Sequence, residues 1–162
     1  MKKYAILGIL MLVLSFSAFA LQVGISFNGD LQDATPCTYL GATVRSAWGL
    51  AGLELAVMPQ ILPELDFTSY RFIVSPSIGW GTPELRIFAG VSPHLMLRKG
   101  QLDFDIAKWN IGAGASFMFA KNILCFFEFF VGFDFRNYEQ LDQLTTGSFI
   151  TVGVTYNFNV GF

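Results

Sequence analysis

The chain has 162 residues, of which 53% are hydrophobic and only 14% are charged, with ten basic against twelve acidic side chains. A soluble domain usually carries about 25% charged residues, and an acidic balance argues against nucleic acid as a partner. A membrane-spanning helix needs a run of about 18 apolar residues, and the chain has no such run beyond its N-terminal segment. High hydrophobicity without such runs favours a closed β-barrel, in which neighbouring strands satisfy every backbone polar group.

The first twenty residues have the pattern of a secretory signal peptide. Lys2 and Lys3 precede an apolar run from residue 4 to 16, and Ala18-Phe19-Ala20 places small residues at the two positions that signal peptidase reads. We therefore expect residues 1–20 to be cleaved and residues 21–162 to form the mature domain. A permanent N-terminal anchor is the alternative, but the apolar run is short for a span of about 20 residues.

Eight later segments alternate apolar and small or polar residues, which is the pattern of β-strands with two different faces. They cover residues 21–28, 38–48, 53–58, 68–80, 84–97, 106–119, 123–136 and 149–162. One face carries Phe, Trp and aliphatic residues along nearly its whole length, whereas the other carries most glycines, small polar residues and a few long charged ones. A β-sandwich can show the same alternation, but a narrow lumen needs this mixture of residue sizes. The sequence predicts an all-β fold, an eight-stranded antiparallel up-and-down transmembrane β-barrel.

The predicted connections alternate in length. Short links at 49–52, 81–83 and 120–122 alternate with longer ones at 29–37, 59–67, 98–105 and 137–148. Outer-membrane barrels have short periplasmic turns and longer external loops, so we expect a barrel surrounded by outer-membrane lipid of a diderm bacterium, with both termini in the periplasm. Pro76 and Pro93 each remove a ladder donor, so an irregularity is expected near each.

The inward face carries the candidate functional residues. The charged and titratable ones in the predicted lumen are Arg45, Glu54, Arg71, Arg86, His94, Lys108, Glu128, Asp134 and Arg136. Tight turns would set Arg45 opposite Glu54 and Lys108 opposite Asp134. One interpretation is an ion-conducting lumen. The other is a packed and paired plug, which is favoured by the bulky inward residues Phe88, Met96, Met118, Phe126 and Phe130.

Other chemistry has little support in the sequence. Cys37 and Cys125 fall at opposite ends of the predicted barrel, so we expect free thiols. One histidine and two distant cysteines offer no metal-ligand spacing and no cofactor is expected. The only catalytic arrangement to consider is Ser92-Pro93-His94.

The last strand carries a family resemblance. Residues 151–162 alternate apolar residues and end in Phe, with the assembly signal at Tyr156, Phe158, Val160 and Phe162. This pattern resembles the small outer-membrane barrels, the OmpA-type barrel domain and OmpX, and implies recognition by the barrel-assembly machinery. An outer-membrane lipid A deacylase family is also an eight-stranded barrel, but its histidine precedes its serine by two residues, which is the reverse of the order here.

The expected function is that of a non-enzymatic outer-membrane barrel, structural or surface-interacting, with a largely plugged and charged lumen. A small pore for ions or small solutes is the alternative. A lipid-modifying enzyme is less favoured, and the sequence identifies no surface ligand.

Overall fold

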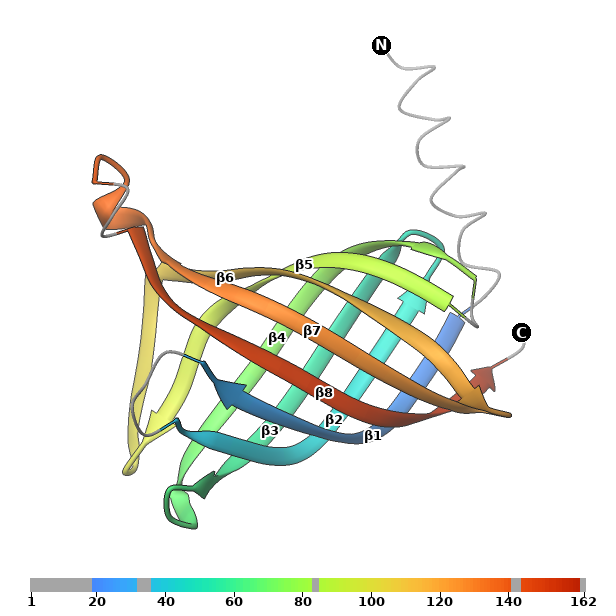
Figure 1. Ribbon diagram of the computed structural model, residues 1–162, viewed down its shortest axis with the longest axis horizontal. Helices are drawn as coiled ribbons and strands as arrows, with labels where there is room; N and C mark the ends of the chain where they lie inside the picture. Colours follow the sequence, from blue (N-terminus) through green and yellow to red (C-terminus); the bar gives the residue numbers. More distant parts are fainter. Residues whose placement is uncertain (1–18, 32–35, 83–84, 141–143, 161–162) are drawn as a thin grey trace.

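The computed structural model describes residues 19–31, 36–82, 85–140 and 144–160, and within these ranges eight strands close into a single barrel (Figure 1). The strands are β1 (Phe19–Asp30), β2 (Thr38–Trp48), β3 (Ala51–Leu62), β4 (Asp66–Gly81), β5 (Leu85–Arg98), β6 (Gln101–Ala120), β7 (Ile123–Asp134) and β8 (Thr145–Val160). A short 3-10 helix, η2 (Phe135–Asn137), follows β7. No helix in the described ranges is both long enough and apolar enough to cross a membrane.

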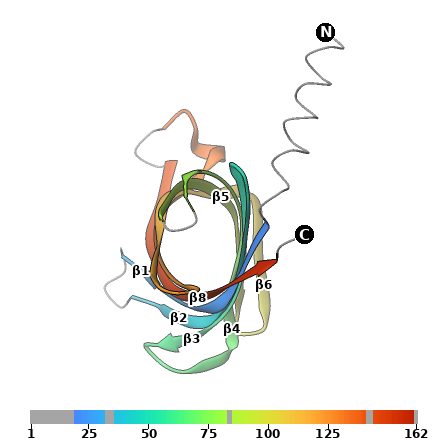
Figure 2. The same ribbon diagram turned by 90° about the vertical axis from the view of Figure 1, so that its right-hand side faces the viewer.

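Every strand pairs antiparallel with its neighbours in the sequence, and β1 pairs with β8 from Phe19 opposite Val160 to Asp30 opposite Phe149. This last pairing closes the ring, which Figure 2 shows end-on. The predicted all-β antiparallel barrel is thus confirmed. We call the end where β1 begins and β8 ends the turn end, because Gly49–Leu50 and Lys121–Asn122 turn the chain there. The opposite end is the loop end, on the left in Figure 1.

Two of the four connections expected to be long are tight turns, so those expectations were wrong. Three residues, 63–65, join β3 to β4, and only Lys99 and Gly100 join β5 to β6. Lys99 and Gly100 both have positive φ, 49° and 78°, and this pair of conformations matches the twist of a two-residue hairpin. Longer connections remain between β1 and β2 and between β7 and β8.

A bulge beside Pro93 explains why the start of β6 was missed. Pro93 pairs with Trp109, but His94 pairs with Asp105, so residues 106–108 have no partners in the β5 register. The side chain of Asp105 accepts a hydrogen bond from the Ala107 amide at 3.0 Å, which satisfies a donor that the ladder leaves free. The expected irregularity at Pro93 is confirmed. Near Pro76 the β4–β5 pairing is interrupted, yet the register is the same on both sides.

The outer surface is apolar along the barrel. Exposed Val, Ile, Leu and Phe side chains alternate with buried ones on most strands. Near the turn end Trp80 and Phe119 are 83% and 75% exposed, and Tyr156 contacts Phe158 on the same surface. Aromatic side chains at the edge of an apolar belt are typical of barrels that span a membrane.

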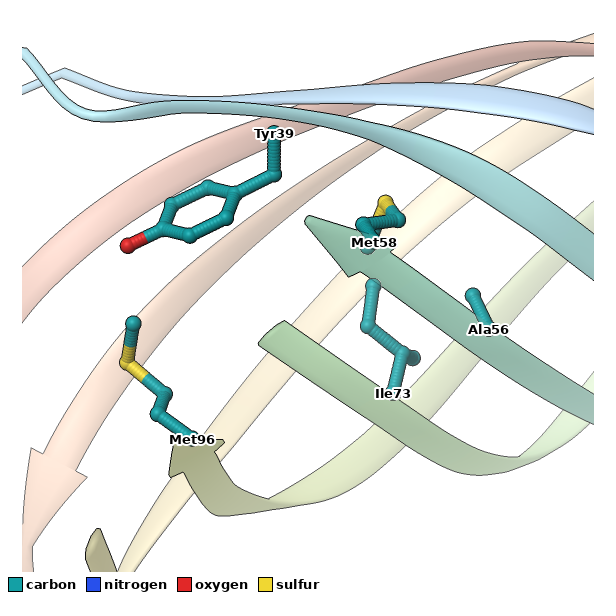
Figure 3. Close-up of a cluster of buried hydrophobic side chains, with 5 residues drawn as sticks. All are labelled: Tyr39, Ala56, Met58, Ile73 and Met96. Carbon is teal, nitrogen blue, oxygen red and sulfur yellow. The ribbon is translucent and has the colours of Figure 1, made fainter. Parts of the chain in front are cut away.

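The interior is filled by side chains of very unequal size. Glycines face the bulky residues: a Cβ on Gly153 would lie 2.4 Å from the Phe126 ring, and one on Gly114 would lie 2.8 Å from Phe88. Nearer the loop end, five buried apolar residues from β2 to β5 form a cluster inside the barrel (Figure 3). They are Tyr39, Ala56, Met58, Ile73 and Met96. Side chains therefore occupy much of the lumen.

Candidate functional site: the charged barrel interior

Arg45 is the centre of an ion cluster that crosses the lumen. It pairs in register with Glu54 across β2 and β3, as the sequence predicted, and its Nε lies 3.4 Å from Glu54 Oε2. On the far side, an Arg45 terminal nitrogen donates to Glu128 Oε1 at 2.8 Å. Because Glu128 belongs to β7, this contact joins opposite walls of the barrel. We call these three residues the arginine layer.

Aromatic rings pack closely around the arginine layer, and its carboxylates are buried. The Arg45 guanidinium carbon lies 4.7 Å from the centre of the Phe88 ring and 4.1 Å from that of Phe126. Glu54 and Glu128 are 3% and 1% exposed. Two carboxylates and two ring faces thus hold the guanidinium. Cation–π contacts strengthen when they are desolvated, so burial adds to the strength of the two ring contacts.

The arginine layer has more acidic groups than basic ones. Two buried carboxylates share one guanidinium, and the Oε2 atoms of Glu54 and Glu128 accept no hydrogen bond. Glu54 receives one further bond, from the Thr43 hydroxyl at 3.2 Å. A buried carboxylate without a counter-charge is costly. The positive charge of Arg45 is therefore the main interaction that offsets the burial of Glu54 and Glu128.

Arg86 lies toward the turn end from the arginine layer. One of its terminal nitrogens donates to the carbonyl oxygens of Leu50 and Ala51, at 2.9 and 3.0 Å. A cavity of about 30 Å³ is lined by both Arg86 and Arg45, which is room for little more than a water molecule. Arg86 therefore anchors the β2–β3 turn to the inside of the barrel.

A second layer of interacting side chains, around Arg71, lies in the lumen nearer the loop end. Arg71 forms an ion pair with Asp30 at 2.7 Å and donates to the side-chain oxygen of Asn28. The side-chain nitrogen of Asn28 in turn donates to the Thr151 hydroxyl oxygen at 2.8 Å. The Arg71 guanidinium carbon lies 4.6 Å from the centre of the Tyr39 ring and 4.9 Å from that of Phe149. We call Arg71, Asp30, Asn28, Tyr39 and Phe149 the upper layer.

On the loop-end side of the upper layer lies a cavity of about 260 Å³, which we call the vestibule and which opens at the loop end. His94, Lys108 and Asp103 line it, and His94 Nε2 lies 3.4 Å from Asp103 Oδ2. Ser92 also lines the vestibule, but its hydroxyl donates to the Pro93 carbonyl at 3.3 Å. Ser92 and His94 therefore show no nucleophile–base contact of the kind that hydrolysis requires.

The predicted partnership of Lys108 and Asp134 needs a correction. The two residues are opposite each other in register, but Asp134 is bound by Arg136, whose Nε and terminal nitrogen lie 2.9 and 2.5 Å from its two carboxylate oxygens. Arg136 was also misplaced: it belongs to η2 at the rim, and its side chain is 58% exposed. The chain turns into η2 directly after Asp134, which brings Arg136 back over that carboxylate.

Arg136 contacts a second acidic side chain besides Asp134. It contacts Asp105 at 2.9 Å. The hydrogen bonds to Asp134 raise the pKa of the Arg136 guanidinium above its usual range, and the charges of Asp105 and Asp134 act in the same direction. The side chain keeps its charge at any accessible pH.

The sequence did not predict that three acidic residues belong to these sites: one in the upper layer, one at the vestibule and one beside Arg136. Asp30, Asp103 and Asp105 were placed in external loops, whereas the strands that carry them are longer than predicted. The alternation offers a signal for Asp30, because Ser26 and Asn28 precede it on the same inward face. Nothing in the local sequence indicates that Glu128 meets Arg45.

The remaining predicted residues lie on the outer face or beyond the described ranges. Tyr156 and Phe158 are exposed on β8, and Val160 is its last residue. Phe162 and most of the predicted signal peptide lie outside the described residues, although Phe19 and Ala20 belong to β1. Cys37 lies at the loop end and Cys125 toward the turn end, and both are free thiols.

The fold resembles solved transmembrane barrels, although neither a described protein family nor any curated protein matches the sequence. A de novo designed transmembrane β-barrel aligns with a TM-score of 0.52 at 14% identity, over 88% of this chain and 96% of the designed one. The N-terminal β-barrel domain of Pseudomonas aeruginosa OprF aligns with a TM-score of 0.51 at 18% identity, over 85% of this chain and 97% of that domain. Neisserial surface protein A (NspA) gives a TM-score of 0.48 at 11% identity, over 86% and 97% of the two chains. The chain therefore has the fold of a transmembrane β-barrel.

Proposed function

We propose that this protein is a non-enzymatic barrel of the outer membrane whose lumen is closed by side chains and whose role is structural or surface-interacting. In this arrangement the turn end and both chain termini face the periplasm, and the loop end faces outward. The observation that supports the proposal most is the arginine layer, in which Arg45 joins opposite walls of the barrel through Glu54 and Glu128. The upper layer adds a second closure.

Planar-bilayer conductance tests the closure. The refolded wild-type barrel is expected to show no steady conductance, because two packed layers block the path. A triple variant, Arg45→Ala with Glu54→Ala and Glu128→Ala, removes the arginine layer without leaving a lone buried charge and is expected to show brief openings. The matched control is Arg98→Ala with Asp103→Ala, a pair at the exposed rim, which should behave as the wild type does.

A small pore is the second candidate function. Two features favour it: cavities lie on both sides of the packed layers, and the arginine layer holds two carboxyl groups for one guanidinium. A steady, cation-selective conductance of the wild-type barrel would replace the closed barrel with the pore.

We also infer that the end of β8 is the segment that the barrel-assembly machinery recognises. Tyr156 and Phe158 are exposed on the outer face of this strand, where an assembly factor can contact them before lipid does. Deletion of Phe162 is expected to leave unassembled protein in the periplasm, detected as loss of heat-modifiable mobility. Deletion of Leu31, which is exposed beyond the end of β1, is the control. Normal assembly of the Phe162 deletion would contradict this inference.

A further inference from the structure

The vestibule has a shape that suits a small ligand entering from the loop end. Its volume is about 260 Å³, slightly less than a typical drug-sized pocket. Met96, Ile73 and Phe149 line its inner part and are buried. Arg98 and Asp103 line it as well, with side chains 62% and 41% exposed. The vestibule therefore has a packed floor and a rim that reaches solvent.

The vestibule has one more permanent positive charge than negative on its lining. The acids are Asp30 and Asp103, and the permanent cations are Arg71, Arg98 and Lys108. Asp30 is bound by Arg71 at 2.7 Å, while Asp103 contacts His94 at 3.4 Å and Arg98 at 4.0 Å. Both acids are thus already engaged by cations.

Lys108 is the cation left over. Within the described residues, no carboxylate oxygen lies within 4.0 Å of its side-chain nitrogen. Its cross-strand neighbour, Asp134, is bound on both carboxylate oxygens by Arg136, which also contacts Asp105. Asp105, Asp134 and Arg136 do not line the vestibule. The ammonium group of Lys108 therefore has no carboxylate partner among the described residues and can offer its positive charge to an anionic ligand.

Neutral donors beside Lys108 are weakly used. The Ser92 hydroxyl donates to the Pro93 carbonyl at 3.3 Å, and the Asn110 amide donates to the Ser92 carbonyl at 3.4 Å. Both distances are long for hydrogen bonds, so a ligand oxygen can replace either acceptor at little cost. A lysine with adjacent hydroxyl and amide donors is a suitable set for an oxyanion.

From this charge balance we propose that the vestibule binds a small oxyanion group, a phosphate or carboxylate, with Lys108 as its principal partner. The inference depends on the fold and the vestibule, and it holds whether or not the lumen conducts. The group has two possible sources, a free ion or a phosphate carried by a sugar of the cell surface.

Chemical-shift titration of the full barrel, refolded in detergent, tests the proposal. Inorganic phosphate represents the free ion and glucose 1-phosphate the sugar-borne group, with glucose as the uncharged control. Addition of either anion is expected to shift the backbone amide signals of vestibule residues such as Ser92, Asn110 and Gly132. Tighter binding of glucose 1-phosphate would favour the surface sugar, and equal binding the free ion.

Substitutions of Lys108 test whether this residue binds the anion. Lys108→Gln is expected to weaken binding by roughly tenfold, because it removes a charge-assisted hydrogen bond. Lys108→Arg should retain binding, and Lys121→Gln, in the exposed turn between β6 and β7, should leave it unchanged. Asp103→Asn removes a competing acid and should tighten binding a few-fold, which keeps the test usable if Lys108→Gln does not fold. Absence of anion-dependent shifts in the vestibule, or shifts that Lys108→Gln does not weaken, would overturn the proposal.

Discussion

Replacing Arg45 with alanine is expected to lower the free energy of unfolding by about 3–5 kcal/mol, the range for breaking a buried ion pair by removing one partner. Glu54 and Glu128 are almost completely buried, and Arg45 is the cation that contacts both. Its loss would leave two buried carboxyl groups without their cation and empty the space between the rings of Phe88 and Phe126. Urea unfolding of the refolded barrel, followed by tryptophan fluorescence, measures the change.

Two further variants separate the charge effect from the packing effect. Arg45→Met combined with Glu54→Gln and Glu128→Gln removes all three charges at similar volume and should recover most of the loss, because neutral replacements of buried ion clusters are well tolerated. Arg98→Ala breaks a pair whose members are 62% and 41% exposed, so solvent screening limits its cost to less than about 1 kcal/mol. If Arg45→Ala costs no more than Arg98→Ala, the arginine layer is hydrated and the lumen is open.

Gly153→Ala is expected to destabilise the barrel by about 1–3 kcal/mol or to prevent refolding, because it overpacks the lumen. The added Cβ would lie 2.4 Å from two atoms of the Phe126 ring and 2.7 Å from the Ile25 carbonyl oxygen. Phe126 has little room to move, since its ring packs against the Arg45 guanidinium at 4.1 Å. The same urea unfolding experiment applies, with heat-modifiable mobility as the measure of refolding.

A matched control and a partial rescue make this prediction specific. Gly29→Ala, also in a strand, places its Cβ no nearer than 3.7 Å to any neighbour and should change the free energy of unfolding by less than about 0.5 kcal/mol. Phe126→Leu combined with Gly153→Ala should cost less than the sum of the two single changes, because the shorter side chain vacates the crowded space. Equal effects of Gly153→Ala and Gly29→Ala would show that Phe126 can move aside.

The sequence by itself determined the class of fold and the sorting of side chains between the two faces. A strand places successive residues on opposite sides, so the alternation separates two faces, and the mixture of glycine, small polar and charged residues on one of them marks it as the interior. It also determined that Arg45 pairs with Glu54, because a tight turn sets the register of the two strands that it joins. Lys108 and Asp134 were placed opposite each other for the same reason.

Beyond the Arg45–Glu54 pair, only the tertiary structure decided which charges meet. Glu128 reaches Arg45 across the lumen, and that contact depends on how the sheet closes on itself through β1 and β8 rather than on any adjacent turn. Asp134 binds Arg136 rather than Lys108 because the chain turns into η2 beyond the last strand pair. The bulge at residues 106–108 interrupts the alternation and hid the start of β6. Local periodicity describes one strand and its neighbour, whereas the partners of a lumenal charge are set by closure, bulges and chain ends, which act across the whole barrel.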